Sequence, residues 1–372
     1  MKTKVKYKQG KLKHKWYFLF VLLIPVFASA QFTDTKEINK YYKVSPETRI
    51  EISNKYGKIE LNTWEKDSVT IKIKIKVEEK KLSKLEKSME EIDFDFTSSE
   101  HFLIVRTKVG ENRGLLEREL LKFKESILQS DGNVEIDYVV WLPKTNSLKV
   151  ENKFGDVFID DYTGELEIDL SNGNLKSHDF KGKVDLTLNF ADATINEMNN
   201  GRIDCNYSEL YIKQANSLRI ISKSSTLEII EINDLDADSR RDKYRIQLID
   251  LLDAQGSFSN FRINELTDRL TLKADYGDLD IEKTSADFSN FYIESKSADI
   301  NLYFDSDTNF GFEITHIKSE LEFGPKVKID EEKTLDEKEN KIKLIGSFGE
   351  NSAGNTKLFI NATSGEINVL SN

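Results

Sequence analysis

The residues with the clearest capacity for chemistry are aromatic side chains at one position of a repeated motif. The motif reads small residue, Asp or Asn, apolar, any residue, apolar, and the position before it holds Tyr56, Phe154, Phe190, Tyr207, Phe258 and Tyr276. Exposed aromatic rings in a row can stack on the apolar faces of sugars. We therefore take Phe154, Phe190, Tyr207, Phe258 and Tyr276 as candidate ligand-stacking residues. The alternative is packing, because strand alternation gives this position inward parity and predicts that the rings fill a corner of the core.

Carboxylates recur two positions after the aromatic residue and form a second candidate row. This column holds Asp156, Asp192, Glu209, Asp278 and Asp299. A ladder of acids could bind cations or polymers, but other copies place Asn174, Thr226, Lys243 and Asn260 there. Asp and Asn beside a small residue are ordinary turn residues. The pattern therefore favours a structural turn.

No residue set in the chain has the spacing of a catalytic or metal centre. His101, His178 and His316 are scattered and lie near no cysteine or paired carboxylate at ligand spacing. Asp160-Asp161 or Asp185 could serve as acid and base in a polysaccharide lyase or hydrolase, because such enzymes also use parallel β-helices. Dense carboxylates are expected at 32% charged residues. We assign no catalytic, metal or cofactor residue and keep the carbohydrate-active enzyme as the alternative.

Cys205 is the only cysteine, so the chain cannot form an intrachain disulfide. In the repeat register it shares a column with Leu170, Leu188, Ser222 and Ala274. Strand alternation points that column inward, which predicts a buried, unreactive thiol.

The elements that must position these residues follow from the repeat. Consecutive copies begin at steps of 17 or 18 residues with one step of 21, at Gly155, Gly173, Ala191, Ser208, Ser225, Asp242, Ser259, Gly277 and Ala298. Each copy is followed by a second alternating segment, such as residues 166–170 or 184–188. Two short strands per repeat, with a period near 20 residues, indicate stacked coils that bury their apolar faces against their neighbours.

The predicted fold is an all-β, single-stranded parallel β-solenoid with coils of about 17–21 residues. Right-handed winding is the favoured hand. A hexapeptide left-handed helix requires an aliphatic residue every six positions, and the spacing here is uneven. Calcium-binding nonapeptide rolls require a Gly-Gly-x-Gly-x-Asp pattern that this chain lacks.

The chain divides into five segments by pattern. Residues 1–30 read as a signal peptide, and 31–146 as an N-terminal β-strand region with a small helical insertion. The helical period spans 78–92, and a second apolar pattern over 115–128 also suggests helix. Residues 147–329 form the regular solenoid, 330–341 a charged loop, and 342–372 the closing strands or cap.

The first 30 residues have the three parts of a secretory leader. A basic stretch reaches Lys15, an apolar run follows from Trp16 to Ala28, and Ala28-Ser29-Ala30 offers a cleavage site. Cleavage would remove seven lysines and no acids, and would take the net charge from −11 to −18. An uncleaved inner-membrane anchor is the alternative. We expect an exported protein of the periplasm, cell surface or extracellular space, with no transmembrane segment after cleavage and no nucleic-acid partner.

Several stretches resemble an exported β-strand-repeat family of bacterial proteins described as adhesins and as a domain of unknown function. They are residues 54–59 (Asn-Lys-Tyr-Gly-Lys-Ile), 137–144, 152–157 and 363–367. The resemblance implies export and a β-helix, without an established ligand, cofactor or catalytic residue. We therefore expect a non-enzymatic structural or adhesin-like binding module of the cell envelope, whose partner is an envelope protein or glycan. The sequence does not specify an oligomeric state.

Overall fold

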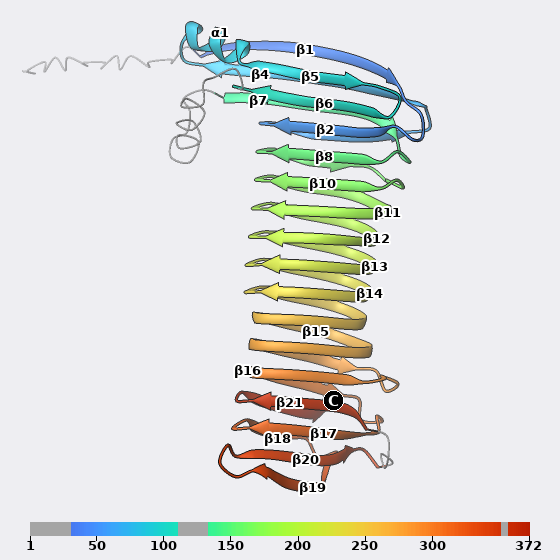
Figure 1. The fold of residues 1–372 in the computed structure, drawn as a ribbon, viewed down its shortest axis with the longest axis vertical. Helices are drawn as coiled ribbons and strands as arrows, with labels where there is room; N and C mark the ends of the chain where they lie inside the picture. The colour runs from blue at the N-terminus through green and yellow to red at the C-terminus, as the bar shows by residue number, and fades with distance from the viewer. Residues whose placement is uncertain (1–30, 111–132, 351–355) are drawn as a thin grey trace, which may run out of the picture.

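The chain winds into a tall stack of parallel coils in a computed structural model that describes residues 31–110, 133–350 and 356–372 (Figure 1). The predicted leader and the helical pattern at 115–128 lie outside the described residues. The central strands are β8 (Leu148–Lys153), β9 (Val157–Ile159), β10 (Leu166–Ser171), β11 (Asn174–Asn189), β12 (Asp192–Asn206), β13 (Glu209–Lys223), β14 (Thr226–Arg240), β15 (Lys243–Thr284) and β16 (Phe291–Phe304). The predicted all-β solenoid is confirmed at this level.

Each coil contributes one segment to each of two sheets. The segment that contains the motif forms one sheet, in which Ala193, Leu210 and Leu227 are successive parallel partners. The second segment forms the other sheet, in which Leu188, Cys205 and Ser222 are successive partners. Parallel in-register pairing at the repeat spacing places identical motif positions in straight columns along the stack.

The core is a set of apolar columns between the two sheets. Leu175, Leu210 and Leu227 are at most 2% exposed, and each packs in line with the residue one coil away. Burying such a side chain contributes about 1.5–3 kcal/mol. Near the C-terminal end the columns give way to a cluster of buried rings, formed by Phe288, Phe291, Phe304, Phe310 and Phe348.

A buried polar ladder lies beside the apolar columns, because the first motif residue points inward in the middle coils. Ser208, Ser225, Asp242 and Ser259 occupy this column and are at most 4% exposed. The Asp242 carboxylate accepts hydrogen bonds from Ser225 N at 2.7 Å, Arg240 N at 2.8 Å, Ser222 Oγ at 2.8 Å and Ser239 Oγ at 2.7 Å. These donors replace the water that the carboxylate loses on burial.

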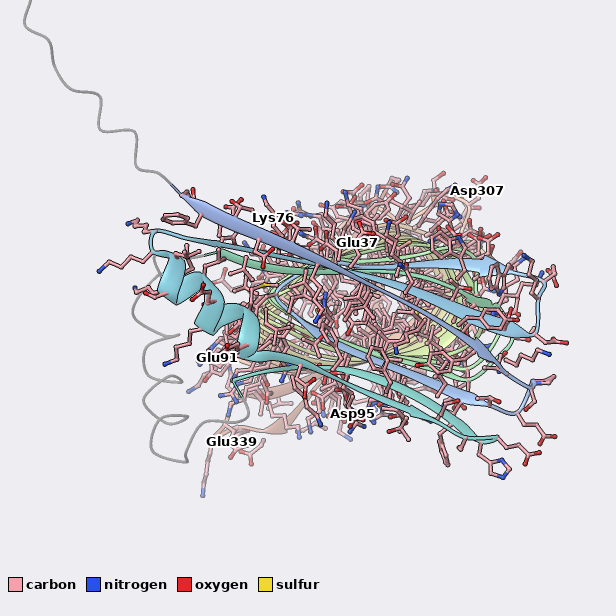
Figure 2. The ribbon with its side chains drawn as sticks, turned by 90° about the horizontal axis from the view of Figure 1, so that it is seen from above. Glu37, Lys76, Glu91, Asp95, Asp307 and Glu339 are labelled. Atoms are coloured by element: carbon pink, nitrogen blue, oxygen red, sulfur yellow. The ribbon has the colours of Figure 1, made fainter. Side chains whose placement is uncertain are left out.

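The N-terminal end is closed by antiparallel strands and a short helix. Its elements are β1 (Phe32–Lys43), β2 (Arg49–Lys55), β3 (Ile59–Trp64), β4 (Ser68–Glu79), α1 (Leu82–Glu90), β5 (Ile92–Ser98), β6 (Phe102–Val109) and β7 (Asn133–Pro143). The coil of β2 and β3 lies between the later strands β6 and β7 on one side and β8 and β9 on the other. Figure 2 looks onto this end and shows β1 crossing it, with α1 at its side. The predicted helix is confirmed, although it is shorter than residues 78–92.

The C-terminal end also departs from chain order. Its strands are β17 (Phe310–Ile317), β18 (Glu320–Phe323), β19 (Val327–Asp336), β20 (Lys341–Phe348), β21 (Thr356–Thr363) and β22 (Glu366–Ser371). The last coil inserts into the stack: β21 pairs with both β16 and β17, and β22 pairs with both β16 and β18. β20 runs antiparallel to β17 and pairs with β19 at its other edge.

We predicted that residues 330–341 form a charged loop, and this prediction was wrong for the first part of the segment. Residues 330–336 belong to β19, and residues 337–340 form the turn into β20. Every side chain from 330 to 336 is exposed, so this part of β19 buries no side chain in the core. Its backbone hydrogen bonds to β20 are sufficient to hold it extended.

Candidate functional site

The aromatic residues before the motif form one exposed edge of the solenoid. Phe154, Phe190, Tyr207, Phe258 and Tyr276 are between 42% and 62% exposed. The expectation that they fill a corner of the core was therefore wrong. Together with Tyr56 they make up what we call the aromatic ridge.

Backbone conformation explains why the ridge side chains point outward although strand alternation predicted that they point inward. Each ridge residue has a positive φ, for example 51° at Phe190, 52° at Tyr207 and 56° at Phe258. A left-handed residue turns the chain from one sheet to the other and interrupts the in-and-out alternation. The same column has φ of 57° at Asn172 and 51° at Ser224, so the bend belongs to the coil and does not depend on an aromatic side chain. For a residue other than glycine this conformation costs about 1–2 kcal/mol.

Hydrogen bonds between coils hold the bend in place. Phe190 N donates to Asn206 O at 3.0 Å, and Tyr207 N donates to Lys223 O at 2.9 Å. The residue after the bend has little room beside the neighbouring backbone: a Cβ added to Gly155 would lie 1.9 Å from Gly57 O. Close approach of consecutive coils therefore explains the glycines at this motif position, whereas the coils with Ser or Asp there turn that side chain inward.

Ridge residues on adjacent coils stack in pairs. Ring centroids are 5.6 Å apart for Tyr56 and Phe154, 5.0 Å for Phe190 and Tyr207, and 4.7 Å for Phe258 and Tyr276. The last two pairs have interplanar angles of 4° and 5°. This geometry follows from strand spacing, which sets neighbouring coils about 4.8 Å apart. The ridge thus presents rigid, flat apolar platforms to the solvent.

The pairs are separated by smaller or charged residues. Asn172 lies between Phe154 and Phe190, about 10 Å apart by coil spacing. Ser224 and Arg241 lie between Tyr207 and Phe258, which are about 14 Å apart by the same measure. Each pair therefore adjoins a gap in the aromatic row, where the bend residue is not aromatic. Sequence reasoning missed Arg241 and its neighbours because it followed the aromatic column alone.

The acidic column serves the turn, as favoured from sequence. Asp156 Oδ1 accepts from the Asn174 backbone N at 2.9 Å, and Asp299 Oδ1 accepts from Glu366 N at 3.0 Å. Each carboxylate thus binds the backbone of the next coil in the stack. Asp278 differs, because desolvation and then the charges of Asp299 and Asp280 raise the pKa of its carboxyl.

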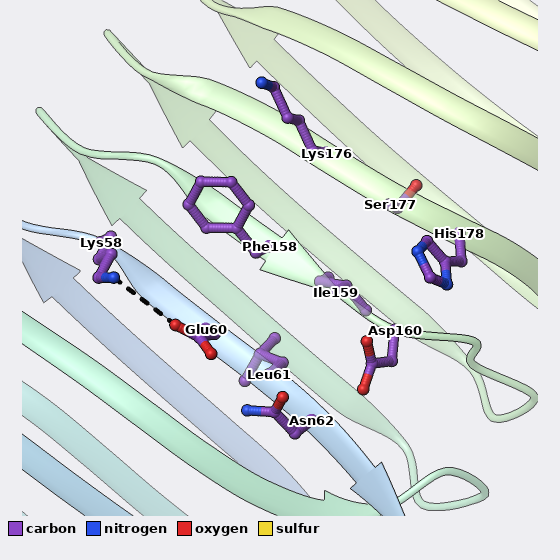
Figure 3. Close-up of a pocket in the computed structure, with 10 residues that line it drawn as sticks. All are labelled: Lys58, Glu60, Leu61, Asn62, Phe158, Ile159, Asp160, Lys176, Ser177 and His178. Carbon is purple, nitrogen blue, oxygen red and sulfur yellow. Dashed lines mark ion pairs between the residues drawn. The ribbon is translucent and has the colours of Figure 1, made fainter.

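An open hollow of about 450 Å³ lies beside β9 and next to the candidate acid Asp160 (Figure 3). Glu60 and Asp160 both line it. Glu60 pairs with Lys58 at 3.6 Å, and Asp160 Oδ2 accepts from Thr63 N at 3.4 Å. Both carboxylates therefore already have partners within the protein.

The other candidate acids are placed apart from Asp160. Asp161 faces His178 at 3.7 Å in an exposed pair, while Asp185 lies on the opposite sheet and pairs with Lys183 at 3.2 Å. Across the described ranges, no group of three or more His, Cys, Asp or Glu is arranged to hold a metal ion.

Cys205 is fully buried, in agreement with its column. Desolvation raises the pKa of its thiol to about 11. We expect native protein at pH 8 to react with a thiol reagent about a hundredfold more slowly than unfolded protein, because the thiolate is the reactive form. Labelling followed by intact mass spectrometry with and without denaturant measures this, and equal rates would contradict it.

Within the part of the chain that the structure describes, no helix has the length and apolar character needed to cross a membrane. The family model Toastrack DUF4097 matches residues 47–370. No curated protein sequence matches the chain.

Solved structures with similar chains come from several bacteria. A candidate cell adhesion protein from Clostridium sporogenes ATCC 15579 is 12% identical with a TM-score of 0.18, and the match covers 91% of this chain and 100% of that one. A candidate adhesin from Parabacteroides distasonis ATCC 8503 is 11% identical with a TM-score of 0.36, covering 72% and 97%. A candidate lipid binding protein from the same organism is 10% identical with a TM-score of 0.35, covering 72% and 96%. At these values they carry no argument about function.

Proposed function

The chain belongs to the Toastrack DUF4097 family, and from this premise we propose that it is an exported, non-enzymatic binding module of the bacterial cell envelope. We propose further that it binds glycans along the aromatic ridge. The observation that carries the proposal is the row of rings that lies 42–62% exposed on a left-handed bend. Exposed apolar rings on a rigid scaffold are costly in water and are typical of contact surfaces.

Export and right-handed winding are parts of the same proposal. The basic, apolar and small-residue pattern of residues 1–30 supports export. Parallel connections of this kind favour right-handed winding. Sequencing the N-terminus of protein recovered from the envelope or the medium tests export, and an electron-density map tests the hand.

Glycan binding is expected to weaken at least about tenfold when Phe190 and Tyr207 are both replaced by asparagine. Asparagine suits the left-handed bend, as Asn172 shows in the same column, so the fold should persist. The measurement is binding of the purified full chain to arrays and extracts of bacterial envelope and extracellular glycans.

The matched control is Tyr292→Asn. Tyr292 is 47% exposed and stacks on Phe359 at 4.9 Å, but on a sheet face instead of the bend. An equal loss with the control, or none with the ridge variant, would contradict a ridge site. Recovery of shortened glycan products would instead support a polysaccharide lyase or hydrolase.

A further inference from the structure

The ridge has a charge pattern that separates it from the rest of this acidic protein. Basic side chains occupy the ridge column or the position just before it, at Lys55, Lys153, Lys223, Arg240, Arg241 and Lys296. Asp275 is the only acid in these two columns. The columns on either side are mainly acidic, with Glu151, Asp169, Asp204, Asp238 and Glu294 against one lysine, Lys273, on one side, and Asp156, Asp192, Glu209, Asp278 and Asp299 against Lys58 and Lys243 on the other. The ridge is thus a basic and aromatic stripe bordered by carboxylates.

The bases cluster most closely in the wider gap of the ridge. Lys223, Arg240 and Arg241 lie on adjacent coils between Tyr207 and Phe258, since Ser224 N bonds to Arg240 O and Arg241 N bonds to Ser257 O, both at 2.9 Å. Lys223 Nζ lies 5.5 Å from the Tyr207 ring centroid. We call Lys223, Arg240 and Arg241 the basic seat.

In the part of the chain that the structure describes, no carboxylate pairs with the two arginines of the seat. Among the described residues, the Arg240 and Arg241 side chains form no ion pair, and both are exposed. By contrast, Arg219 on a sheet face pairs with Asp236 at 2.7 Å. An exposed guanidinium offers several donors in a fork that matches a carboxylate.

We infer that the ridge binds an acidic glycan, with sugar rings against the aromatic pairs and carboxylates on the basic seat. This inference rests on the proposed glycan-binding function and adds the class of ligand. The gap between Tyr207 and Phe258, about 14 Å, is wide enough for sugar units to lie across Arg240 and Arg241. The acidic borders repel the same ligand from the faces of both sheets and confine it to the ridge.

The test compares oligogalacturonate, a neutral gluco-oligosaccharide and polyglutamate as ligands of the purified full chain. The seat variant is Arg240→Ser with Arg241→Asn, which keeps residues found in the same columns of other coils. The control is Lys181→Gln with Lys213→Gln, which removes equal charge from exposed positions outside the stripe and its borders. We expect oligogalacturonate to bind most tightly, and the seat variant alone to weaken it about tenfold.

Added salt should weaken oligogalacturonate binding to the unaltered chain more than to the seat variant, because screening acts on the charge pairs. Equal binding of the neutral oligosaccharide, or an unaffected seat variant, would overturn the acidic-glycan inference while the proposed function stands. Equal binding of polyglutamate would show that the ridge recognises negative charge without sugar rings, and this result would also overturn the acidic-glycan inference. Absence of binding to any glycan would overturn the proposed function itself.

Discussion

A chain that lacks residues 356–372 is expected to lose ordered structure from β17 to β20, while the coils from β8 to β16 remain folded. The missing strands lie inside the stack, where they pair with β16 on one side and with β17 and β18 on the other. Their loss removes buried apolar side chains at Leu358, Ile360, Ala362, Ile367 and Val369. At about 1.5–3 kcal/mol for each large one, the local loss is on the order of 8 kcal/mol.

Hydrogen exchange read by mass spectrometry measures this effect coil by coil. A point variant gives a milder form of the same test: Ile360→Asp places a charge in the core, whereas Asn361→Asp changes the exposed neighbour on the same strand. Protection of residues 310–348 should fall with the first variant and persist with the second. Unchanged protection in the truncated chain would mean that β17 to β20 dock without the inserted coil.

Replacing Asp242 with alanine is expected to destabilise the middle coils by about 4 kcal/mol. The carboxylate is 2% exposed and accepts four hydrogen bonds at 2.7–2.8 Å, two of them from backbone N–H groups. Alanine would leave the backbone N–H groups of Ser225 and Arg240 without this acceptor, whereas the Ser222 and Ser239 hydroxyls keep Tyr244 OH and Ser259 Oγ as partners. Hydrogen exchange of residues 222–259, together with the denaturant midpoint, measures the loss.

Asp242→Ser is the matched control. Ser208, Ser225 and Ser259 occupy the same column in nearby coils, so a hydroxyl fits there and can accept from the backbone. We expect it to cost less than half of the alanine effect. If the alanine variant unfolds at the same denaturant concentration as the unaltered chain, the donors must find other partners and the ladder is not a source of stability.

The periodic part of the molecule could be predicted from sequence because its information is local. Leu175, Leu210 and Leu227 recur at the coil spacing, and the structure buries them in one column. The same reasoning placed Cys205 inside. When a buried contact joins equivalent residues of adjacent coils, strand alternation and the repeat period are sufficient to predict it from the sequence.

Two kinds of feature could not be predicted, for different physical reasons. The orientation of Phe190 and Tyr207 depends on a left-handed φ, and alternation rules assume an unbroken strand. Asn172 and Ser224 in the same column were a usable signal, since Asn and Ser are common at such bends. The insertion of β21 and β22 between β16 and the earlier strands β17 and β18 is non-local, and no sequence period encodes it.

The inserted last coil gives the two ends of the solenoid different mechanical strengths. Force applied at the C-terminus acts on β22, which is bonded along both edges, so β22 can leave only by sliding past two neighbours at once. Force applied at the N-terminus acts on β1, which is bonded to β4 along one edge and can peel away one bond at a time. A tether at the C-terminal end would therefore resist flow or traction that would unravel the molecule from its other end.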